Sequence, residues 1–335
     1  MTSGNDIVVR CKKLTKIYNE EIVALEDLDL EIARGQIFGY IGHNGAGKTT
    51  TIRILAGLLK ATRGSASIAG VDVNSGRDRI KSLVGYMPDH FGVYDQMRVW
   101  EYLDFFGAAF KIARGRRRER IDYVLDVTEA EYMRDRFVDT LSRGMKQRVG
   151  IARTLLHDPE VLLLDEPASG LDPRARVHMR QLLRKLADGG KTLMVSSHIL
   201  PELAAVCDTI GIIHQGHLRA SGPITKVLSE LQRDRLMELK AAAGVAPAAD
   251  VISADANVMA DPGRESKVDD TDIAGGVLRF RFKGDDETLA GLLDKILAAG
   301  TRIVTFREVP MSLEDAYMAV SGIGSEDHPE DYPEN

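Results

Sequence analysis

Cysteine is scarce in this chain: its 335 residues include only two, Cys11 and Cys207. Two cysteines cannot build the disulfide framework on which small secreted domains depend, and neither stands at the spacing of a metal ligand. We therefore expect both to be ordinary packed residues of a protein in a reducing cytoplasm.

Long apolar runs are also missing. A helix that crosses a bilayer needs about 18 or more apolar residues, whereas apolar stretches such as 161–164 and 210–213 have the length of strands. The first residues lack the basic head and apolar stretch of a secretory signal. Any membrane role is therefore expected to depend on a partner chain.

Positive charge is not in excess either. The 44 Lys and Arg residues against 50 Asp and Glu residues give a formal net charge of −6, so nucleic acid is not an expected partner. The one dense basic run, Arg114–Arg120, is typical of a solvated helix start. Contact of this run with anionic lipid headgroups or with an acidic partner is the alternative.

A glycine-rich loop follows the apolar segment 36–41. Residues 42–49 read Gly-His-Asn-Gly-Ala-Gly-Lys-Thr and fit the phosphate-binding pattern G-x4-G-K-[ST] at every fixed position. The glycines let backbone N–H groups turn toward phosphates, and the helix that follows adds partial positive charge. Lys48 would neutralise the β- and γ-phosphates, and the Thr49 hydroxyl would bind Mg²⁺.

Two further strands end in side chains that suit ATP hydrolysis. The apolar strand 161–164 leads into Asp165, which suits contact with Mg²⁺, and Glu166, which can polarise an attacking water. The strand 192–196 leads to His198, a titratable group that can bond the γ-phosphate. The structural alternatives are a strand edge that ends in acids and a histidine satisfied by its neighbours.

The segment Leu-Ser-Arg-Gly-Met-Lys-Gln-Arg at 141–148 lies between the loop and the acidic strand. Together these motifs resemble the ATPase subunit of an ABC transporter, over about residues 7 to 225. The resemblance implies that Glu166 and His198 are catalytic and that Tyr18 stacks on adenine. The implied ATP-binding set is Tyr18, Gly42, His43, Asn44, Gly45, Ala46, Gly47, Lys48, Thr49 and Thr50. The implied signature, which acts on the ATP of a second chain, is Leu141, Ser142, Arg143, Gly144 and Met145, and the implied D-loop ends at Asp172.

The alternation of strands and helices predicts an α/β fold with a parallel sheet. The resemblance adds that this is a P-loop NTPase of the ABC-ATPase type, with a parallel-sheet core, an antiparallel β subdomain and a helical subdomain at about 90–150. Residues 226–322 are expected to form a small α+β appendage, with a loose insertion at about 242–272. The acidic tail, 323–335, is expected to be disordered.

Within the family, the signature form and the segment 309–317 are similar to ATPases of exporters for daunorubicin-type drugs, polysaccharides and related cargo. This branch implies a homodimer that uses ATP and Mg²⁺ and works with a separately encoded polytopic membrane subunit. It also implies a cytoplasmic protein that is peripheral on the inner face of the membrane. The alternatives are a soluble ABC ATPase without a transport role and a regulatory ATP-binding module.

Two positions depart from the family pattern. Asp89 stands where a glutamine often senses Mg²⁺ and faces the membrane subunit. An aspartate could bind the cation through water, or it could add repulsion to a site that already holds two acids. Met145 stands where many relatives have glycine, which would reshape backbone contacts to the γ-phosphate.

Overall fold

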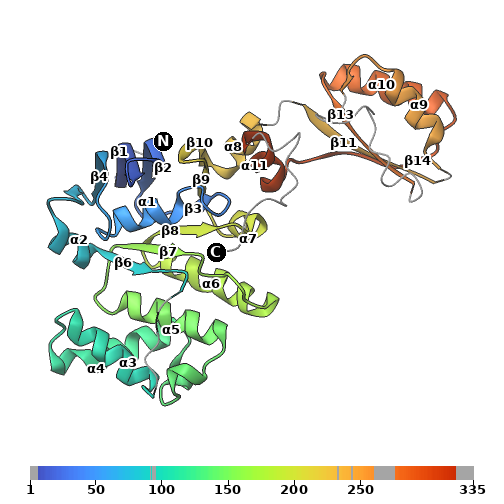
Figure 1. Ribbon diagram of the computed structural model, residues 1–335. Coiled ribbons are helices and arrows are strands. Elements are labelled where there is room, and N and C mark those ends of the chain that lie inside the picture. Colours follow the sequence, from blue (N-terminus) through green and yellow to red (C-terminus); the bar gives the residue numbers. More distant parts are fainter. Residues whose placement is uncertain are drawn as a thin grey trace. The chain divides into compact units, whose positions relative to one another are not determined.

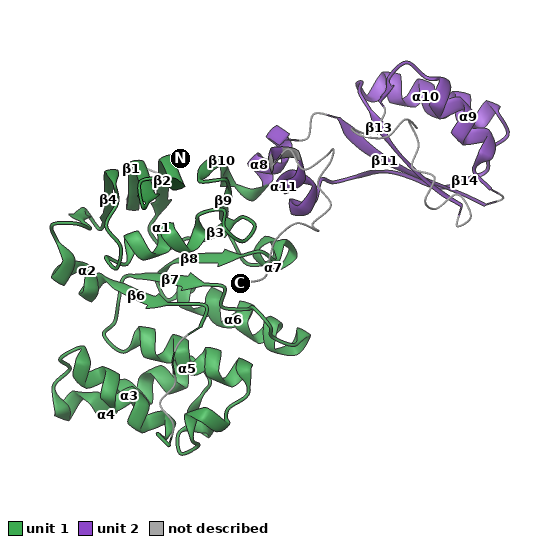
Figure 2. Ribbon diagram, in the orientation of Figure 1, with its two compact units in different colours: residues 1–224 green, residues 225–335 purple. Residues whose placement is uncertain are grey.

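The chain folds as two units that divide between Ile224 and Thr225, one residue before the division predicted from the sequence (Figure 2). The computed structural model describes residues 7–90, 92, 96–231, 234–242, 244–259 and 276–321. The predicted tail 323–335 lies outside these residues. No helix within the described ranges has the length and apolar character needed to cross a bilayer.

A six-stranded sheet is the centre of the first unit (Figure 1). Its strands, in spatial order, are β10 (His217–Pro223), β9 (Thr209–His214), β3 (Ile37–Ile41), β8 (Thr192–Ser197), β7 (Val161–Asp165) and β6 (Val84–Met87). All neighbours pair in parallel except β10, which is antiparallel to β9. Every residue of β3, β7 and β8 is buried, as expected where both faces of a parallel sheet are covered.

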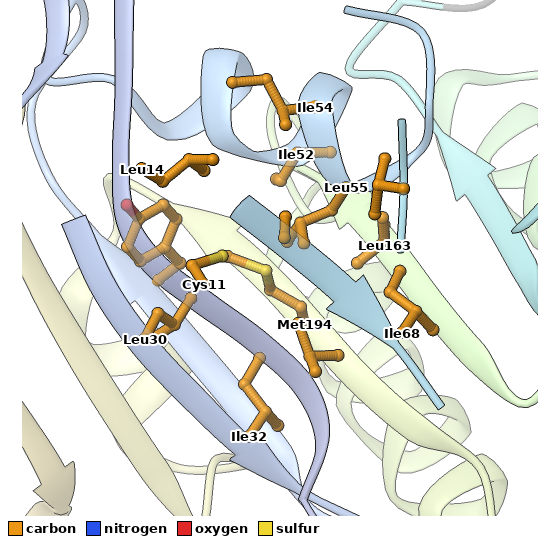
Figure 3. Packing of buried hydrophobic residues seen from close by; sticks show 14 of the residues in the cluster. Cys11, Leu14, Leu30, Ile32, Ile52, Ile54, Leu55, Ile68, Leu163 and Met194 are labelled. Carbon is orange, nitrogen blue, oxygen red and sulfur yellow. The ribbon is translucent and has the colours of Figure 1, made fainter. Parts of the chain in front are cut away.

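A smaller antiparallel sheet packs with the first helix against this core. Its strands, in order, are β2 (Ile22–Ala33), β1 (Ile7–Tyr18), β4 (Arg63–Ile68) and β5 (Val71–Asp72). One apolar cluster combines residues of this sheet with helix α1 (Lys48–Leu55) and with β7 and β8 (Figure 3). Because Ile52 and Leu55 of α1 are fully buried in that cluster, the helix that follows the glycine-rich loop is held in place.

The remaining helices of the first unit connect the strands. They are α2 (Arg77–Leu83), α3 (Val99–Ala109), α4 (Arg114–Val127), α5 (Arg143–Leu155), α6 (Pro173–Asp188) and α7 (Leu200–Ala204). Short 3₁₀ turns lie at Glu131–Met133 and Val138–Thr140. Helices α3 and α4 lie in the range predicted for the helical subdomain, about 90–150, and α5 begins in it but continues to Leu155. Helix α4 begins at the first arginine of the basic run.

The second unit is a four-stranded antiparallel sheet with helices between its strands. After α8 (Ile224–Leu231), it contains β11 (Arg235–Ala241), α9 (Ala246–Ala254), β12 (Val258–Met259), β13 (Val277–Phe282), α10 (Asp286–Ala298), β14 (Ile303–Val309) and α11 (Leu313–Ser321). The strand order β12-β13-β11-β14, with the chain order β-α-β-β-α-β, is the ferredoxin-like arrangement.

The loose insertion predicted for 242–272 is wrong in its first part, because α9 and β12 lie there. Alanine is the best helix former, and a proline is tolerated in the first turn, where Pro247 stands. Ala248 and Ile252 are fully buried against the sheet residues of this unit. Residues 260–272 of the predicted insertion lie outside the described residues.

Replacing Leu163 by alanine tests how strongly the core beneath the glycine-rich loop depends on β7. Leu163 is fully buried, so we expect Leu163→Ala to lower the free energy of unfolding by about 2–5 kcal/mol. Chemical denaturation can be followed through Trp100, the single tryptophan of the chain. The matched control is Leu58→Ala, because Leu58 is 65% exposed. Equal losses in the two variants would contradict the prediction.

Candidate functional site

The carboxyl ends of β3, β7 and β8 lie at one edge of the parallel sheet, because these strands run in the same direction (Figure 1). A cavity of about 290 Å³ opens there. Its lining residues are His43, Asn44, Gly45, Gly47, Lys48, Thr49, Thr50, Asp89, Asp165 and Glu166. Each of these ten residues was predicted from the sequence to bind ATP, to bind the metal or to act in catalysis.

The loop between β3 and α1 needs its glycines for conformation and for space. Gly45 and Gly47 have φ angles of 83° and 112°, which other residues rarely adopt. A Cβ atom at Gly47 would lie 2.7 Å from the Ala24 carbonyl oxygen, and one at Gly42 would lie 2.7 Å from that of Ile213. Ala46 between them is fully buried. The loop is therefore fixed by close contact with neighbouring backbone.

Lys48 is the buried cation of this loop. Its Nζ donates to the carbonyl oxygens of Gly42 at 2.5 Å and His43 at 3.2 Å, and it lies 3.5 Å from Glu166 Oε1. Burial lowers the pKa of Lys48, while the carboxylates of Glu166 and Asp165 oppose that shift. An ammonium group held this way is positioned to meet an anion that enters the cavity.

Asp165 is held on both carboxylate oxygens. Thr49 Oγ1 donates to Asp165 Oδ2 at 2.8 Å, and Ser196 Oγ donates to Asp165 Oδ1 at 2.6 Å. The Ser196 oxygen also accepts from the backbone N–H of Glu166 at 3.0 Å. Ser196 was not predicted as a site residue, and the only sequence signal for it was its place just before His198. Its role depends on the register of β7 with β8, in which Asp165 pairs with Ser196.

Glu166 and His198 are directly joined. His198 Nδ1 lies 2.8 Å from Glu166 Oε2, while Glu166 Oε1 is buried and has no hydrogen-bond partner. Glu166 has a φ angle of 50°, an uncommon conformation for a residue with a side chain, and such strain is concentrated at functional sites. The glutamate thus presents to the cavity, beside Lys48, one carboxylate oxygen that accepts no hydrogen bond.

The predicted signature lies outside the lining of this cavity. Ser142 caps α5, since its Oγ accepts from Met145 N at 3.4 Å, and Leu141 is buried. Arg143 Nη2 donates to Ser169 Oγ at 3.4 Å and lies 3.8 Å from Asp89 Oδ1. The charge of Asp89 therefore has a partner that the sequence did not reveal.

Tyr18 and Asp172 are not among the residues that line the cavity. Tyr18 lies at the end of β1, its hydroxyl is 3.4 Å from Thr50 Oγ1, and Lys16 Nζ lies 5.0 Å from its ring centroid. Asp172 caps α6 by accepting from Ala175 N at 2.9 Å. Among the described residues, no three His, Cys, Asp or Glu side chains are grouped to hold a metal by themselves.

Comparison with known proteins agrees with this geometry. The sequence profile described as ABC transporter matches residues 25–169, and one described as an AAA domain matches residues 136–205. A solved structure titled as the ATP-binding subunit of an ABC transporter superposes with a TM-score of 0.60 at 29% identity, over 67% of this chain and 92% of that one. A dimeric bacterial ABC transporter cassette superposes with a TM-score of 0.58 at 27% identity, over 64% of this chain and 98% of that one.

Curated relatives are named as ATP-binding proteins. An uncharacterised ABC transporter ATP-binding protein of Synechocystis is 38% identical over 66% of this chain, but the match spans only 64% of that protein. The linearmycin resistance ATP-binding protein LnrL of Bacillus subtilis is 32% identical over 69% of this chain and 74% of its own length. The bacitracin transport ATP-binding protein BcrA of Bacillus licheniformis is 40% identical over 63% of this chain and 68% of its own. Since profile, relatives and solved structures agree with the loop and the acidic strand, this chain belongs to the ATP-binding subunits of the ABC transporter family.

Proposed function

We propose that this chain binds ATP with Mg²⁺, hydrolyses it as a homodimer and thereby powers an exporter whose membrane part is a separate polytopic chain. The observation that carries the proposal is the position of Glu166. One of its oxygens is held by His198 at 2.8 Å, and the other faces the loop lysine at 3.5 Å. A carboxylate between a histidine and a phosphate loop is suited to orient and deprotonate water.

The phosphate loop supplies binding and charge. Backbone N–H groups at the N-terminus of α1 and the ammonium of Lys48 would surround the β- and γ-phosphates. When phosphates enter, Lys48 would exchange its bonds to Gly42 and His43 for bonds to phosphate oxygens. Tyr18 would stack on the adenine.

The residues of the cavity fit Mg²⁺. This ion prefers oxygen ligands and is usually held by one or two carboxylates together with phosphate oxygens and waters. The Thr49 hydroxyl and the Asp165 carboxylate, whose oxygens lie 2.8 Å apart, would be protein ligands of the ion. Asp89 supplies a second carboxylate in the same cavity. When bound, the ion would neutralise charge on the phosphates.

Hydrolysis would proceed on the side of the γ-phosphate that faces Glu166. Its free oxygen would accept the proton of the attacking water, while His198 holds the other oxygen and bonds the γ-phosphate. Ser196 fixes the backbone of Glu166 and the carboxylate of Asp165, so both acids keep their positions.

A second copy would complete the site. The signature residues 141–145 do not line the cavity of their own chain. They include the N-cap and the first residues of α5, a helix of 13 residues whose N-terminus can donate to a γ-phosphate. ATP bound between the cavity of one chain and Ser142–Gly144 of the other would hold the two together, and loss of the γ-phosphate would release them.

The exporter assignment follows the names of relatives, two of which concern antibiotic resistance or transport. A separately encoded membrane subunit would place the chain at the inner face of the cell membrane. Of the basic run Arg114–Arg120 at the start of α4, the exposed arginines at 114, 116 and 118 would then be available to the membrane surface, whereas Arg117 and Arg120 bond within the protein.

Removing the carboxylate of Glu166 tests its role as the base. We expect Glu166→Gln to bind ATP normally but to hydrolyse it roughly 10²- to 10⁴-fold more slowly, the usual range for a lost general base. Steady-state phosphate release and calorimetric ATP binding are the two measurements. The control is Glu160→Gln, because Glu160 lies before β7 and contacts Arg34 rather than the cavity. Normal turnover by Glu166→Gln would contradict the assignment.

Mixing two inactive variants tests whether the signature acts on the ATP of the second chain. Lys48→Ala removes the loop cation but keeps the signature. Gly144→Asp places a carboxylate where the γ-phosphate is expected, and its Cβ fits because the nearest atom is 3.4 Å away. We expect each variant alone to be inactive and their mixture to regain ATP hydrolysis, since a mixed dimer contains one intact site.

A second mixture and the wild-type protein serve as controls for this experiment. Lys48→Ala mixed with Glu166→Gln should stay inactive, because both changes lie in the cavity and no mixed dimer has an intact one. If the Lys48→Ala and Gly144→Asp mixture also stays inactive while wild-type chains hydrolyse ATP, the shared site is disproved.

A further inference from the structure

Glu202 is a buried carboxylate for which the mechanism above has no role. It lies in α7, four residues after His198, and only 9% of the residue is exposed. Neither of its carboxylate oxygens makes a hydrogen bond. A buried carboxylate is costly unless a nearby charge compensates it, so its surroundings bear on why it is there.

The compensating charge is Arg176 of α6. Arg176 Nε lies 3.1 Å from Glu202 Oε1 and at the same time donates to the carbonyl oxygen of Leu171 at 2.9 Å. Leu171 is buried and lies in the segment 169–172, which the family resemblance implies to be the D-loop. The guanidinium therefore connects the helix that follows His198 with the loop that follows Glu166.

The two connected segments hold Glu166 from opposite ends. On one side, the D-loop is tied to Glu166, because Ser169 N donates to the Glu166 carbonyl oxygen at 3.1 Å. On the other side, His198 holds the Glu166 carboxylate at 2.8 Å. His198 itself is 48% exposed at its side chain, so its position depends on the backbone that carries it. Helix α7 follows that backbone directly.

The charged groups around Glu202 include Glu166 and His198 of the proposed site. Burial raises the pKa of Glu202, and the nearby Glu166 raises it further, while Arg176, Arg180 and His198 lower it. Of these, Arg176 is the group in direct contact.

We propose that Glu202 is a positioning residue for ATP hydrolysis: through Arg176 it ties α7 to the D-loop and thereby keeps His198 on Glu166. The inference rests on the proposed function, since it concerns the same carboxylate. Glu202 touches neither ATP nor water in this role, and its effect passes through His198.

The test is a comparison of Glu202→Gln with the wild-type full-length protein. Glutamine keeps the shape of the side chain and removes its charge. We expect kcat for ATP to fall by about 10-fold, as for a modest misplacement of a catalytic group, with KM for ATP unchanged. A general loss of structure would instead change binding as well, and the thermal midpoint of each variant reports on folding.

A double variant shows whether the effect passes through His198. We expect Glu202→Gln combined with His198→Ala to hydrolyse ATP no more slowly than His198→Ala alone, because the positioned group is already absent. An additional loss of similar size in the double variant would overturn the proposal.

Arg184→Gln is the matched control. Arg184 lies two turns further along α6 and pairs with Asp208 at 3.0 Å, away from His198. We expect its kcat to equal that of the wild type. Equal kcat values for Glu202→Gln and the wild type would overturn the positioning role while leaving the proposed function intact. Absence of ATP hydrolysis in the wild type would instead refute the proposed function.

Discussion

The parallel pairing of β7 with β8 is the constraint on which the site depends. Its register places Asp165 beside Ser196, so one hydroxyl bonds the Asp165 carboxylate and the backbone N–H of Glu166. A slip of one residue would turn these side chains to the other face of the sheet. The buried apolar residues of both strands resist such a slip, because every one of them would lose its packing.

Charge burial is the second feature that organises the site. Lys48, Asp165 and Glu166 are all nearly inaccessible, and each contacts a polar or charged group of the site. Such an arrangement is costly without complete pairing. Glu166 Oε1 accepts no hydrogen bond and lies 3.5 Å from Lys48 Nζ, which donates to carbonyl oxygens of its own loop, so this charge pair is incomplete. An anion that enters the cavity would add pairing to the buried Lys48 cation.

The second unit has its own core and needs no contribution from the site. Its four antiparallel strands bury one face against α9 and α10. On β11, Glu238 is paired with Arg279 and Arg307 of the neighbouring strands, which lowers the pKa of Glu238. The ferredoxin-like arrangement serves many functions, so the fold by itself assigns none to this unit.

The sequence by itself determined the chemistry of the first unit. Three features were recognised from the sequence: the loop 42–49, the acids after the strand at 161–164, and His198. Such motifs are local, and the spacing of their residues indicates the turn or strand end that carries them. Helix α9 was missed because a nine-residue segment is too short to be a stable helix by itself and forms only where a sheet covers its apolar face.

Only the tertiary structure decided which side chains meet across the sheet edge. Three such pairs join residues that lie between 26 and 54 positions apart in the chain. They are Ser196 with Asp165, Arg143 with Asp89, and Arg176 with Glu202. No local pattern marks such pairs, because they arise from strand register and from the packing of helices on the sheet. The local motifs therefore indicate the type of reaction, and the long-range contacts determine the positions of the reacting side chains.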